Sequence, residues 1–490
     1  MGIVLKQSLN NTIITYIGFA FGAINSLFLY TKFLTAEYYG LVGVILSASS
    51  LMMPLLAFGV PNTLVKYFSS FKNSAHSDGF LTMMMFLPLL MIFPLAVVAY
   101  FANGAIGDFI SKENAIVKNY VLYIFLIGVA MAYFEVFYAW SRVQMKSVFG
   151  NFMKEVFVRI GVAILLLGVY FKWISIDAFL IALVILYVLR TLIMNLYAFK
   201  LRFPKIDFNF PKNTKTILEY SALIILGGSV AVILFEMDKL MINQFIKIEN
   251  VAYYSVAIFM ATAIAVPSRA MHQITYPLTA QILNNKDTEA LKKLYHKSAL
   301  TLLIVSGFIF VLIMLNLNDL YQLLDPSYSQ GFLVVFLIGC TKVYDAMLGN
   351  INAILYNSDD YKVLLFMGVI VAIIAVLLNL WLIPIYGLFG AAYASFISLI
   401  IYNTIKLFFV KMRFGIVPFT PELAKVFILL CGLGLGFCFV SLPFHPIVNI
   451  VLKSSFVTPV FIWFLYTFKW SDDVYNILSK YLKKIKTPQE

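Results

Sequence analysis

The chain has 490 residues, of which 62% are hydrophobic and only 12% are charged. Soluble domains carry about 25% charged residues, and a soluble protein of this size needs that charge to cover its surface. Together with a mean hydropathy of +0.91, the composition excludes a soluble protein and predicts one that crosses a membrane many times.

The formal net charge of +13 comes from 36 basic and 23 acidic residues. In a soluble protein this excess would suggest nucleic-acid binding, but the cytoplasmic loops of membrane proteins also collect Lys and Arg. We therefore expect no nucleic-acid partner. We also expect no metal site and no disulfide framework, because the three cysteines lie inside apolar runs without the required spacing: Cys340, Cys431 and Cys438.

Apolar runs of about 20 residues, the length that crosses a bilayer, follow one another along the whole chain. The predicted spans cover residues 9–33, 40–65, 79–101, 119–141, 148–171, 174–199, 216–245, 251–275, 297–317, 331–356, 362–383, 386–410, 421–441 and 446–468. The loops between them are short. The sequence thus predicts an all-α polytopic membrane protein with about 14 transmembrane helices and without an extramembrane domain for catalysis.

Basic residues are concentrated in alternate loops. With the N-terminus inside, the inner loops contain Lys66, Lys72, Arg142, Lys146, the basic residues of 200–215, the lysines of 286–297, Lys411 and Arg413. The outer loops contain little beyond Lys112, Lys118, Lys172 and Lys247. Because cytoplasmic loops carry the excess of Lys and Arg, we expect a cell (inner) membrane protein with both termini in the cytoplasm.

Two parts of the chain resemble each other at an offset of roughly 210 residues. The pattern near Glu37 recurs near Glu249, and each copy begins a span that contains a Val-Pro step, at Pro61 and at Pro267. Six spans per repeat is an even number, so two lobes in parallel pseudo-two-fold repeat are expected around a central cavity. The expected parts are an N-terminal lobe (1–200), a cytoplasmic linker (201–215), a C-terminal lobe (216–412), an extra helix pair (413–468) and a basic cytoplasmic tail (469–490).

Polar side chains at membrane depth are the candidates for function, because a charge in the bilayer core costs several kcal/mol and usually faces a cavity or a partner. In the first span, Asn25 shares one helix face with other small and polar residues. Such a face suits a water-filled lumen, or close helix packing through Gly18 and Gly22. We favour the lumen for Asn25.

The fourth and fifth spans each place charged residues on one helix face. Glu135 precedes Arg142 by seven residues, and Glu155 precedes Arg159 by four, the favourable order for an ion pair. We interpret Glu155 as part of a structural pair near the cytoplasmic end. Arg159 lies deeper in its span and is the better candidate for the lumen.

The seventh span contains the densest charged group, with Glu236, Asp238 and Lys239. Asp238 and Lys239 are adjacent, so they cannot occupy the same helix face, and we expect at least one of them to serve function. In the eighth span, Arg269 follows Pro267, where the helix is expected to kink.

Several short motifs resemble those of a known family. The stretches 33–41 and 58–62 resemble the N-terminal pattern of polysaccharide-biosynthesis flippases, within the multidrug/oligosaccharidyl-lipid/polysaccharide exporter superfamily. Residues 238–257 and 383–392 are similar to the second half of that pattern, in the same order and spacing. The resemblance implies two lobes around a central cavity and the transfer of undecaprenyl-diphosphate-linked oligosaccharides from the inner to the outer leaflet.

In this family, lumenal Arg and Lys contact the anionic substrate. The resemblance extends that role to Arg142, Arg159, Lys239 and Arg269, with Asn25 as a polar neighbour. By alternating access, the lobes would rock about the site, and Asp238, Glu135 or Glu236 would bind a coupling H⁺ or Na⁺. No other cofactor is expected. The expected partners are the lipid-linked oligosaccharide (O-antigen, capsule or exopolysaccharide unit), membrane lipid, a polysaccharide polymerase and a chain-length regulator, with the protein acting as a monomer.

Three alternatives stay open. A multidrug or cation antiporter of the same superfamily would carry cationic substrates, which a cavity rich in Arg and Lys disfavours. A membrane polysaccharide polymerase or ligase would carry a large outer loop, and this chain has only short loops. A flippase for teichoic or other acidic polymers fits the same sequence features.

Overall fold

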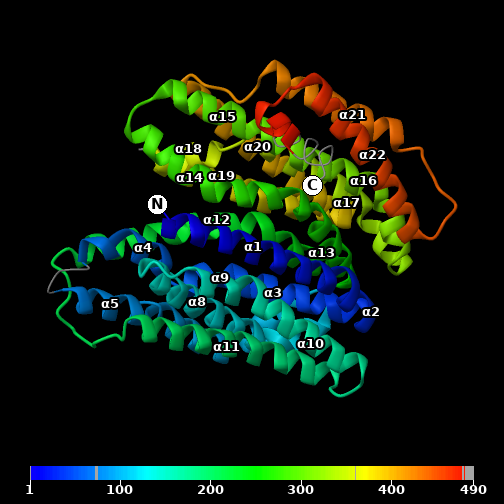
Figure 1. The fold of residues 1–490 in the computed structure, drawn as a ribbon. Coiled ribbons are helices and arrows are strands. Elements are labelled where there is room, and N and C mark those ends of the chain that lie inside the picture. Colours follow the sequence, from blue (N-terminus) through cyan, green and yellow to red (C-terminus); the bar gives the residue numbers. More distant parts are fainter. Residues whose placement is uncertain (1, 72–75, 359, 477–478, 481–490) are drawn as a thin grey trace, which may run out of the picture. The chain divides into compact units, whose positions relative to one another are not determined.

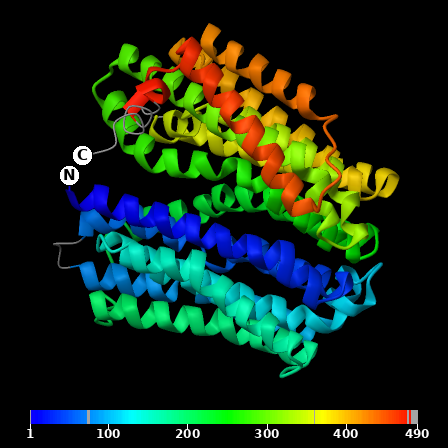
Figure 2. The ribbon, with the colours of Figure 1, turned by 45° about the vertical axis from the view of Figure 1, so that its right-hand side comes forward.

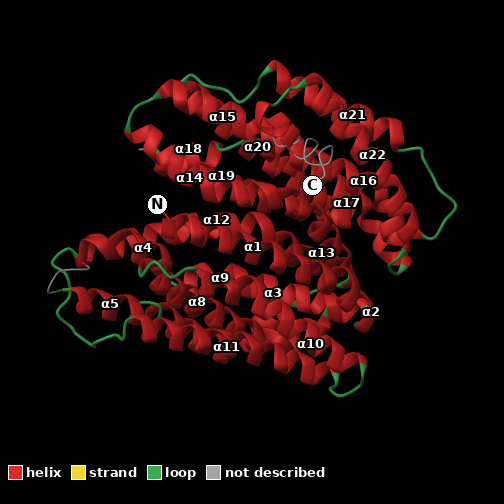
Figure 3. Ribbon diagram, viewed as in Figure 1, coloured by secondary structure: helices red, strands yellow, loops and turns green. Residues whose placement is uncertain are grey.

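A computed structural model of the protein describes residues 2–71, 76–358, 360–476 and 479–480. All the regular elements in these ranges are helical, and they contain no strand (Figure 3). The all-α fold class expected from the composition is thereby confirmed. Lys72 and residues 481–490 of the expected basic tail lie outside the described residues.

The helices form two compact units. Unit 1 comprises Met1–Val256 and Gly368–Ser395, and unit 2 comprises Ala257–Met367 and Phe396–Glu490. Helix packing defines these units, whereas repeat symmetry defined the expected lobes. The lobe boundaries therefore stay a prediction.

Unit 1 contains the elements of the N-terminal half. These are α1 (Gly2–Ala23), η1 (Ile24–Leu29), α2 (Tyr30–Phe33), α3 (Ala36–Leu56), α4 (Val60–Phe71), α5 (Ser77–Phe86), α6 (Leu89–Phe101), α7 (Asn103–Ile110), η2 (Ala115–Tyr120), α8 (Val121–Val143), α9 (Val148–Phe152), η3 (Met153–Phe157), α10 (Val158–Tyr170), α11 (Ile176–Leu201) and α12 (Thr214–Phe245). It also takes in parts of three helices that it shares with unit 2, namely α13 (Glu249–Thr262), α19 (Tyr361–Tyr386) and α20 (Leu388–Phe414).

Unit 2 contains the rest. Its elements are η4 (Ala263–Ala265), α14 (Val266–Asn284), α15 (Thr288–Leu302), η5 (Leu303–Gly307), α16 (Phe308–Gln322), η6 (Pro326–Gly331), α17 (Phe332–Met347), α18 (Ile351–Asn357), α21 (Pro421–Phe437) and α22 (Pro446–Phe468). The segments η1, η3 and η5 are π-helical, and η2, η4 and η6 are 3₁₀-helical.

Several helices begin at residues that cap them. Thr35 accepts a hydrogen bond from the backbone N–H of Tyr38 at the start of α3, and Ser175 accepts one from Ala178 at the start of α11. Such caps satisfy backbone donors that have no partner within the helix. A 3₁₀ segment, η4, separates α13 from α14 just before Pro267, while the kink expected near Arg269 stays a prediction.

The described residues contain eleven helices that are long and apolar enough to cross a membrane, or twelve if the bent α12 counts as one span. The two parts of α12, Thr214–Val230 and Val232–Phe245, meet at 56°. The remaining two expected spans are also helical, but α9–η3–α10 carries three charged residues and α21 is only 17 residues long. The protein is a multi-pass membrane protein, while the count of fourteen stays a prediction.

In unit 1, α8 packs between α3 and α11 (Figure 1). Fully buried aromatic side chains, Trp140 and Phe134 of α8 and Phe80 of α5, form part of this core. Gly59, with φ of +65°, sits at the turn before α4, where an added Cβ would lie 2.2 Å from the carbonyl oxygen of Ser221. Only glycine permits both that backbone conformation and the close contact of this turn with α12.

In unit 2, α16 packs against α21 and α22, which are orange and red in Figure 2. Phe308 and Phe461 stack face to face, with ring centroids 4.3 Å apart. Large apolar side chains are exposed in both units, such as Phe93 and Trp173 in unit 1 and Phe366 and Trp463 in unit 2. Exposed surface of this kind is the surface that lipid covers.

Candidate functional site

Unit 1 contains a cluster of charged side chains between α8, η3 and α11. The Nζ of Lys154 donates to Glu135 Oε1 at 2.6 Å. Arg142 and Arg190 also lie near enough to Glu135 to interact with it electrostatically. Within the described part of the chain, no carboxylate lies within ion-pair distance of either arginine.

Both arginines are stabilised by aromatic rings. The Arg190 guanidinium lies 4.0 Å from the ring centroid of Phe134, and that of Arg142 lies 5.0 Å from Tyr138. Cation–π contacts of this kind attract a guanidinium without neutralising it. The Arg142 Nε is buried and has no hydrogen-bond partner in the described residues, so this arginine retains a donor for a ligand.

The second group joins the first span to the fifth. Arg159 Nη1 donates to Glu155 Oε2 at 2.8 Å, which confirms the expected i,i+4 pair. Asn25 is buried, and its Nδ2 donates to the backbone oxygen of Arg159 at 2.7 Å. An added Cβ at Gly18 would lie 2.6 Å from the backbone oxygen of Glu155, so Gly18 permits this close packing.

π-Helical segments are present on both sides of this contact. Asn25 belongs to η1 and Glu155 to η3. Single-turn π-bulges are rare and often occur at functional sites. Asn25 packs on the backbone of Arg159, while the side chain of Arg159 stays partly exposed. This helix face can therefore pack closely against the fifth span and still border a lumen.

The third group lies on α12. Lys239 Nζ donates to Glu236 Oε2 at 2.9 Å, and the hydroxyl of Ser47 on α3 donates to the same oxygen at 2.7 Å. Tyr187, on α11, lies near Glu236, Arg159 and Arg190. The three charged groups of unit 1 therefore converge around Tyr187.

Asp238 lies in a different environment from its neighbour Lys239. Its side chain is buried and accepts hydrogen bonds from the hydroxyls of Tyr254 and Ser395 and from Asn379 Nδ2, the last at 2.9 Å. All three donors are neutral. Asn379 Oδ1 is buried beside this carboxylate with no hydrogen-bond partner among the described residues. The arrangement offers a negative charge and a free amide oxygen, which suits a proton or a hard cation such as Na⁺.

In unit 2, Arg269 is exposed on α14 and lies within ion-pair distance of no carboxylate in the described residues. A further cation, Lys406 on α20, is almost fully buried. Its Nζ donates to Asn352 Oδ1 at 3.1 Å and lies 3.9 Å from Asp345 Oδ1. In the described residues, no group of three His, Cys, Asp or Glu side chains is placed to hold a metal ion.

Sequence reasoning missed three of these cations: Lys154, Arg190 and Lys406. A signal was present for two of them, because Arg190 is the only charged residue in 178–199 and Lys406 the only one in 388–410. A single charge in a long apolar run is costly unless it serves a partner or a cavity. The substrate-binding and ion-coupling residues that were predicted from the sequence are those described in the preceding paragraphs.

The polysaccharide biosynthesis protein family model matches residues 4–283, which is more than half of the chain. The chain belongs to this family. The family resemblance expected from the sequence is thereby confirmed. A comparison with curated protein sequences gives no significant match.

Solved structures show the same fold. The lipid II flippase MurJ in an inward closed conformation matches with a TM-score of 0.68 and 17% identity, over 93% of this chain and 98% of that one. An inward-facing multidrug resistance MATE transporter of the MOP superfamily matches with a TM-score of 0.64 and 13% identity, over 85% and 99%. A MOP superfamily transporter from Pyrococcus furiosus, described as having a binding pocket of reverse polarity, matches with a TM-score of 0.54 and 12% identity, over 84% and 95%.

Proposed function

We propose that the protein is a flippase, without covalent chemistry of its own. It moves an undecaprenyl-diphosphate-linked oligosaccharide from the cytoplasmic to the outer leaflet of the cell membrane. The family membership and the transporter fold support this proposal. O-antigen, capsule, exopolysaccharide and other acidic-polymer units remain within the substrate class.

The observation that carries the proposal is the charge of the cluster around Glu135 and Tyr187. It contains five basic groups (Arg142, Lys154, Arg159, Arg190 and Lys239) and three acidic ones (Glu135, Glu155 and Glu236), which leaves a net charge of +2 when Asp238, the separate ion site beside Lys239, is not counted. A diphosphate carries the opposite charge. Guanidinium groups bind phosphate oxygens in a bidentate fork, and the two arginines without an ion pair are available for that contact.

Ion coupling is assigned first to Asp238. Glu135 and Glu236 each have a lysine partner, at 2.6 and 2.9 Å, whereas the hydrogen-bond donors to Asp238 are neutral. A buried carboxylate without a cation gains most from an incoming H⁺ or Na⁺. Glu135 and Glu236 would take up an ion only after the diphosphate has drawn their lysines away.

The transport cycle follows from these two assignments. The substrate head group enters the polar cavity by alternating access, and its prenyl chain stays in lipid. Arg269 supplies a further positive charge, in unit 2. The distribution of basic loops supports an orientation with both termini in the cytoplasm, and in this proposal the protein functions as a monomer beside a polysaccharide polymerase and a chain-length regulator.

The test replaces single cations and measures surface polysaccharide at equal protein level. We expect Arg142→Ala and Arg190→Ala to lower polysaccharide export about tenfold, the effect of losing a charge-assisted hydrogen bond. The same measurement is made on three further variants of the proposed substrate site: Arg159→Ala, Lys239→Ala and Arg269→Ala.

Lys112→Ala is the control, because it removes the same charge from an exposed loop position. Its export should equal that of the wild type. Wild-type export from every variant of the cluster would contradict the assignment of the substrate site.

A multidrug or cation antiporter is the second candidate, favoured by the fold shared with the MATE transporters. A cluster with a net charge of +2 repels organic cations, and this argues against it. Ethidium efflux separates the two functions. Energised cells expressing the flippase should retain ethidium as the empty-vector cells do.

A further inference from the structure

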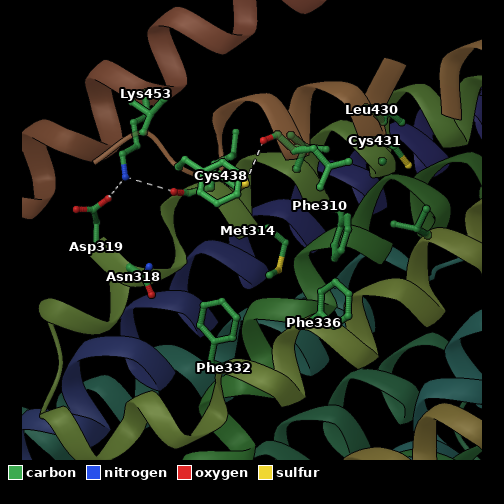
Figure 4. A pocket seen from close by; sticks show the side chains of 18 of the residues that line it. Phe310, Met314, Asn318, Asp319, Phe332, Phe336, Leu430, Cys431, Cys438 and Lys453 are labelled. Atoms are coloured by element: carbon green, nitrogen blue, oxygen red, sulfur yellow. Dashed lines mark hydrogen bonds and ion pairs between the residues drawn. The ribbon is translucent and has the colours of Figure 1, made fainter. Parts of the chain in front are cut away.

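Unit 2 contains a cavity of about 970 Å³ between α16, α17, α21 and α22 (Figure 4). This volume is at the upper end of the range for small-ligand pockets, about 300–1,000 Å³. None of the residues assigned above to transport lines the cavity. Exposed apolar side chains, Leu435 and Phe439, form part of its wall, so the cavity opens where lipid surrounds the protein.

One end of the cavity is polar. Lys453 Nζ donates to Asp319 Oδ2 at 2.7 Å, and Asn449 Nδ2 donates to Asp319 Oδ1 at 2.9 Å. Asn449 is only 4% exposed, yet its Oδ1 has no hydrogen-bond partner within the described residues. The side chains of Asn318 and Gln322 also line this end.

The rest of the cavity is apolar. Phe310, Met314, Phe332 and Phe336 line it on one side and Leu430 of α21 on the other, while Asp319 and Lys453 lie together at one edge (Figure 4). The cavity therefore has the polarity of a membrane lipid, with a charged end and an apolar body. By the distribution of basic loops, the polar end faces the outer side of the membrane.

We propose that this cavity binds a phospholipid with a primary ammonium head group, namely phosphatidylethanolamine. The polar end carries one carboxylate and one ammonium group, which matches a zwitterionic head group better than an anionic one. The ethanolamine N–H groups would donate to Asp319 and to the free Oδ1 of Asn449. Lys453 would contact the phosphate.

The N–H donors and the positive charge of its head group together distinguish phosphatidylethanolamine from other common phospholipids. A choline head group carries a positive charge but no N–H, so it leaves Asn449 Oδ1 unsatisfied. A phosphatidylglycerol head group has no positive charge for Asp319. The cavity should therefore select ethanolamine over both.

Native mass spectrometry of the full-length protein in detergent tests the proposal. The protein is titrated with phosphatidylethanolamine, phosphatidylcholine or phosphatidylglycerol of identical acyl chains. We expect phosphatidylethanolamine to bind about tenfold more tightly than either of the others, the effect of one charge-assisted hydrogen bond.

Two glycines of α21 provide matched variants. A Cβ added at Gly434 or at Gly432 meets no atom within 4 Å, but only Gly434 lines the cavity. Gly434→Leu should abolish the preference for phosphatidylethanolamine, and Gly432→Leu should preserve it. Asp319→Asn tests the polar end and should reduce the preference about tenfold.

Equal binding of the three phospholipids would overturn the proposal. A preference for phosphatidylethanolamine that survives in Gly434→Leu would overturn it as well, because the lipid would then bind elsewhere. Tighter binding of a polyprenyl phosphate than of any phospholipid would assign the cavity to a prenyl chain instead. None of these outcomes depends on the proposed transport function.

Discussion

Two buried carboxylates, one in each unit, share part of their environment and differ in the rest. Asp238 in unit 1 and Asp319 in unit 2 are each 4% exposed, and each accepts a hydrogen bond of 2.9 Å from an asparagine Nδ2. In both cases the asparagine Oδ1 has no partner among the described residues. Asp319 has a counter-ion in Lys453, whereas the donors to Asp238 are neutral.

The difference shows how the surroundings give one residue type two functions. A carboxylate paired with lysine is largely neutralised, so it gains little from a lone inorganic cation, although it can still accept from a zwitterionic head group whose phosphate engages the lysine. A carboxylate whose hydrogen-bond donors are all neutral has no cation in direct contact to offset its charge, and a proton or a metal cation relieves it. Asp238 is therefore suited to coupling, and Asp319 to holding a fixed polar site.

The largest expected effect is on transport by Asp238→Asn. An amide of the same shape binds neither the coupling proton nor Na⁺ as the carboxylate does. Transport should fall by roughly 5–150-fold, the range of a coupling free energy of 1–3 kcal/mol. Flipping rates of purified variants in liposomes measure this, and an unchanged rate would remove Asp238 from the coupling mechanism.

The same substitution should have opposite effects on stability in the two units. Asp319→Asn leaves Lys453, whose side chain is 12% exposed, without its ion-pair partner and should lower the free energy of unfolding by about 1–3 kcal/mol. Asp238→Asn removes an uncompensated charge and should preserve or raise stability. Thermal unfolding in detergent checks both, and similar losses in the two variants would show that the environments are energetically equivalent.

A smaller effect is expected from the asparagine beside Asp238. Asn379→Leu removes the free amide oxygen and should raise the ion concentration for half-maximal transport about tenfold. Asn316→Leu is the matched control, because Asn316 is also buried with an unpartnered Oδ1 but lies outside both sites. If both variants reach half-maximal transport at the same ion concentration, Asn379 takes no part in ion binding.

The smallest effect is expected from one hydroxyl. Ser395→Ala removes one of the three donors to Asp238 and should change stability by only about 0.5–1.5 kcal/mol, the net contribution of one hydrogen bond. The carboxylate should then bind its ion more readily, with half-maximal transport at a lower ion concentration. A shift to a higher concentration would mean that the Ser395 hydroxyl itself is an ion ligand.

The sequence predicts interactions within one helix better than interactions between helices. The Glu155–Arg159 pair was predicted because both residues lie on one helix face. Asp238 and Lys239 were expected on different faces, and their partners do differ. The fold class followed from composition, since so apolar a chain satisfies its backbone in the bilayer by forming helices.

Contacts between residues far apart in the chain could not be predicted from the sequence. Lys453 lies 134 residues from Asp319, and Asn379 lies 141 residues from Asp238. Periodicity along one helix carries no information about which helices become neighbours. The pairing of Glu135 with Lys154 was missed for the same reason, because they lie on successive helices.

The most direct test of the central claim uses the purified protein in liposomes with a fluorescent undecaprenyl-diphosphate-linked disaccharide. Wild-type protein should move this lipid to the opposite leaflet when a Na⁺ or H⁺ gradient is imposed, and both dissipation of the gradient and Asp238→Asn should slow the movement by roughly 5–150-fold. Movement that is equal with and without the gradient, and equal in Asp238→Asn, would contradict ion-coupled flipping through Asp238.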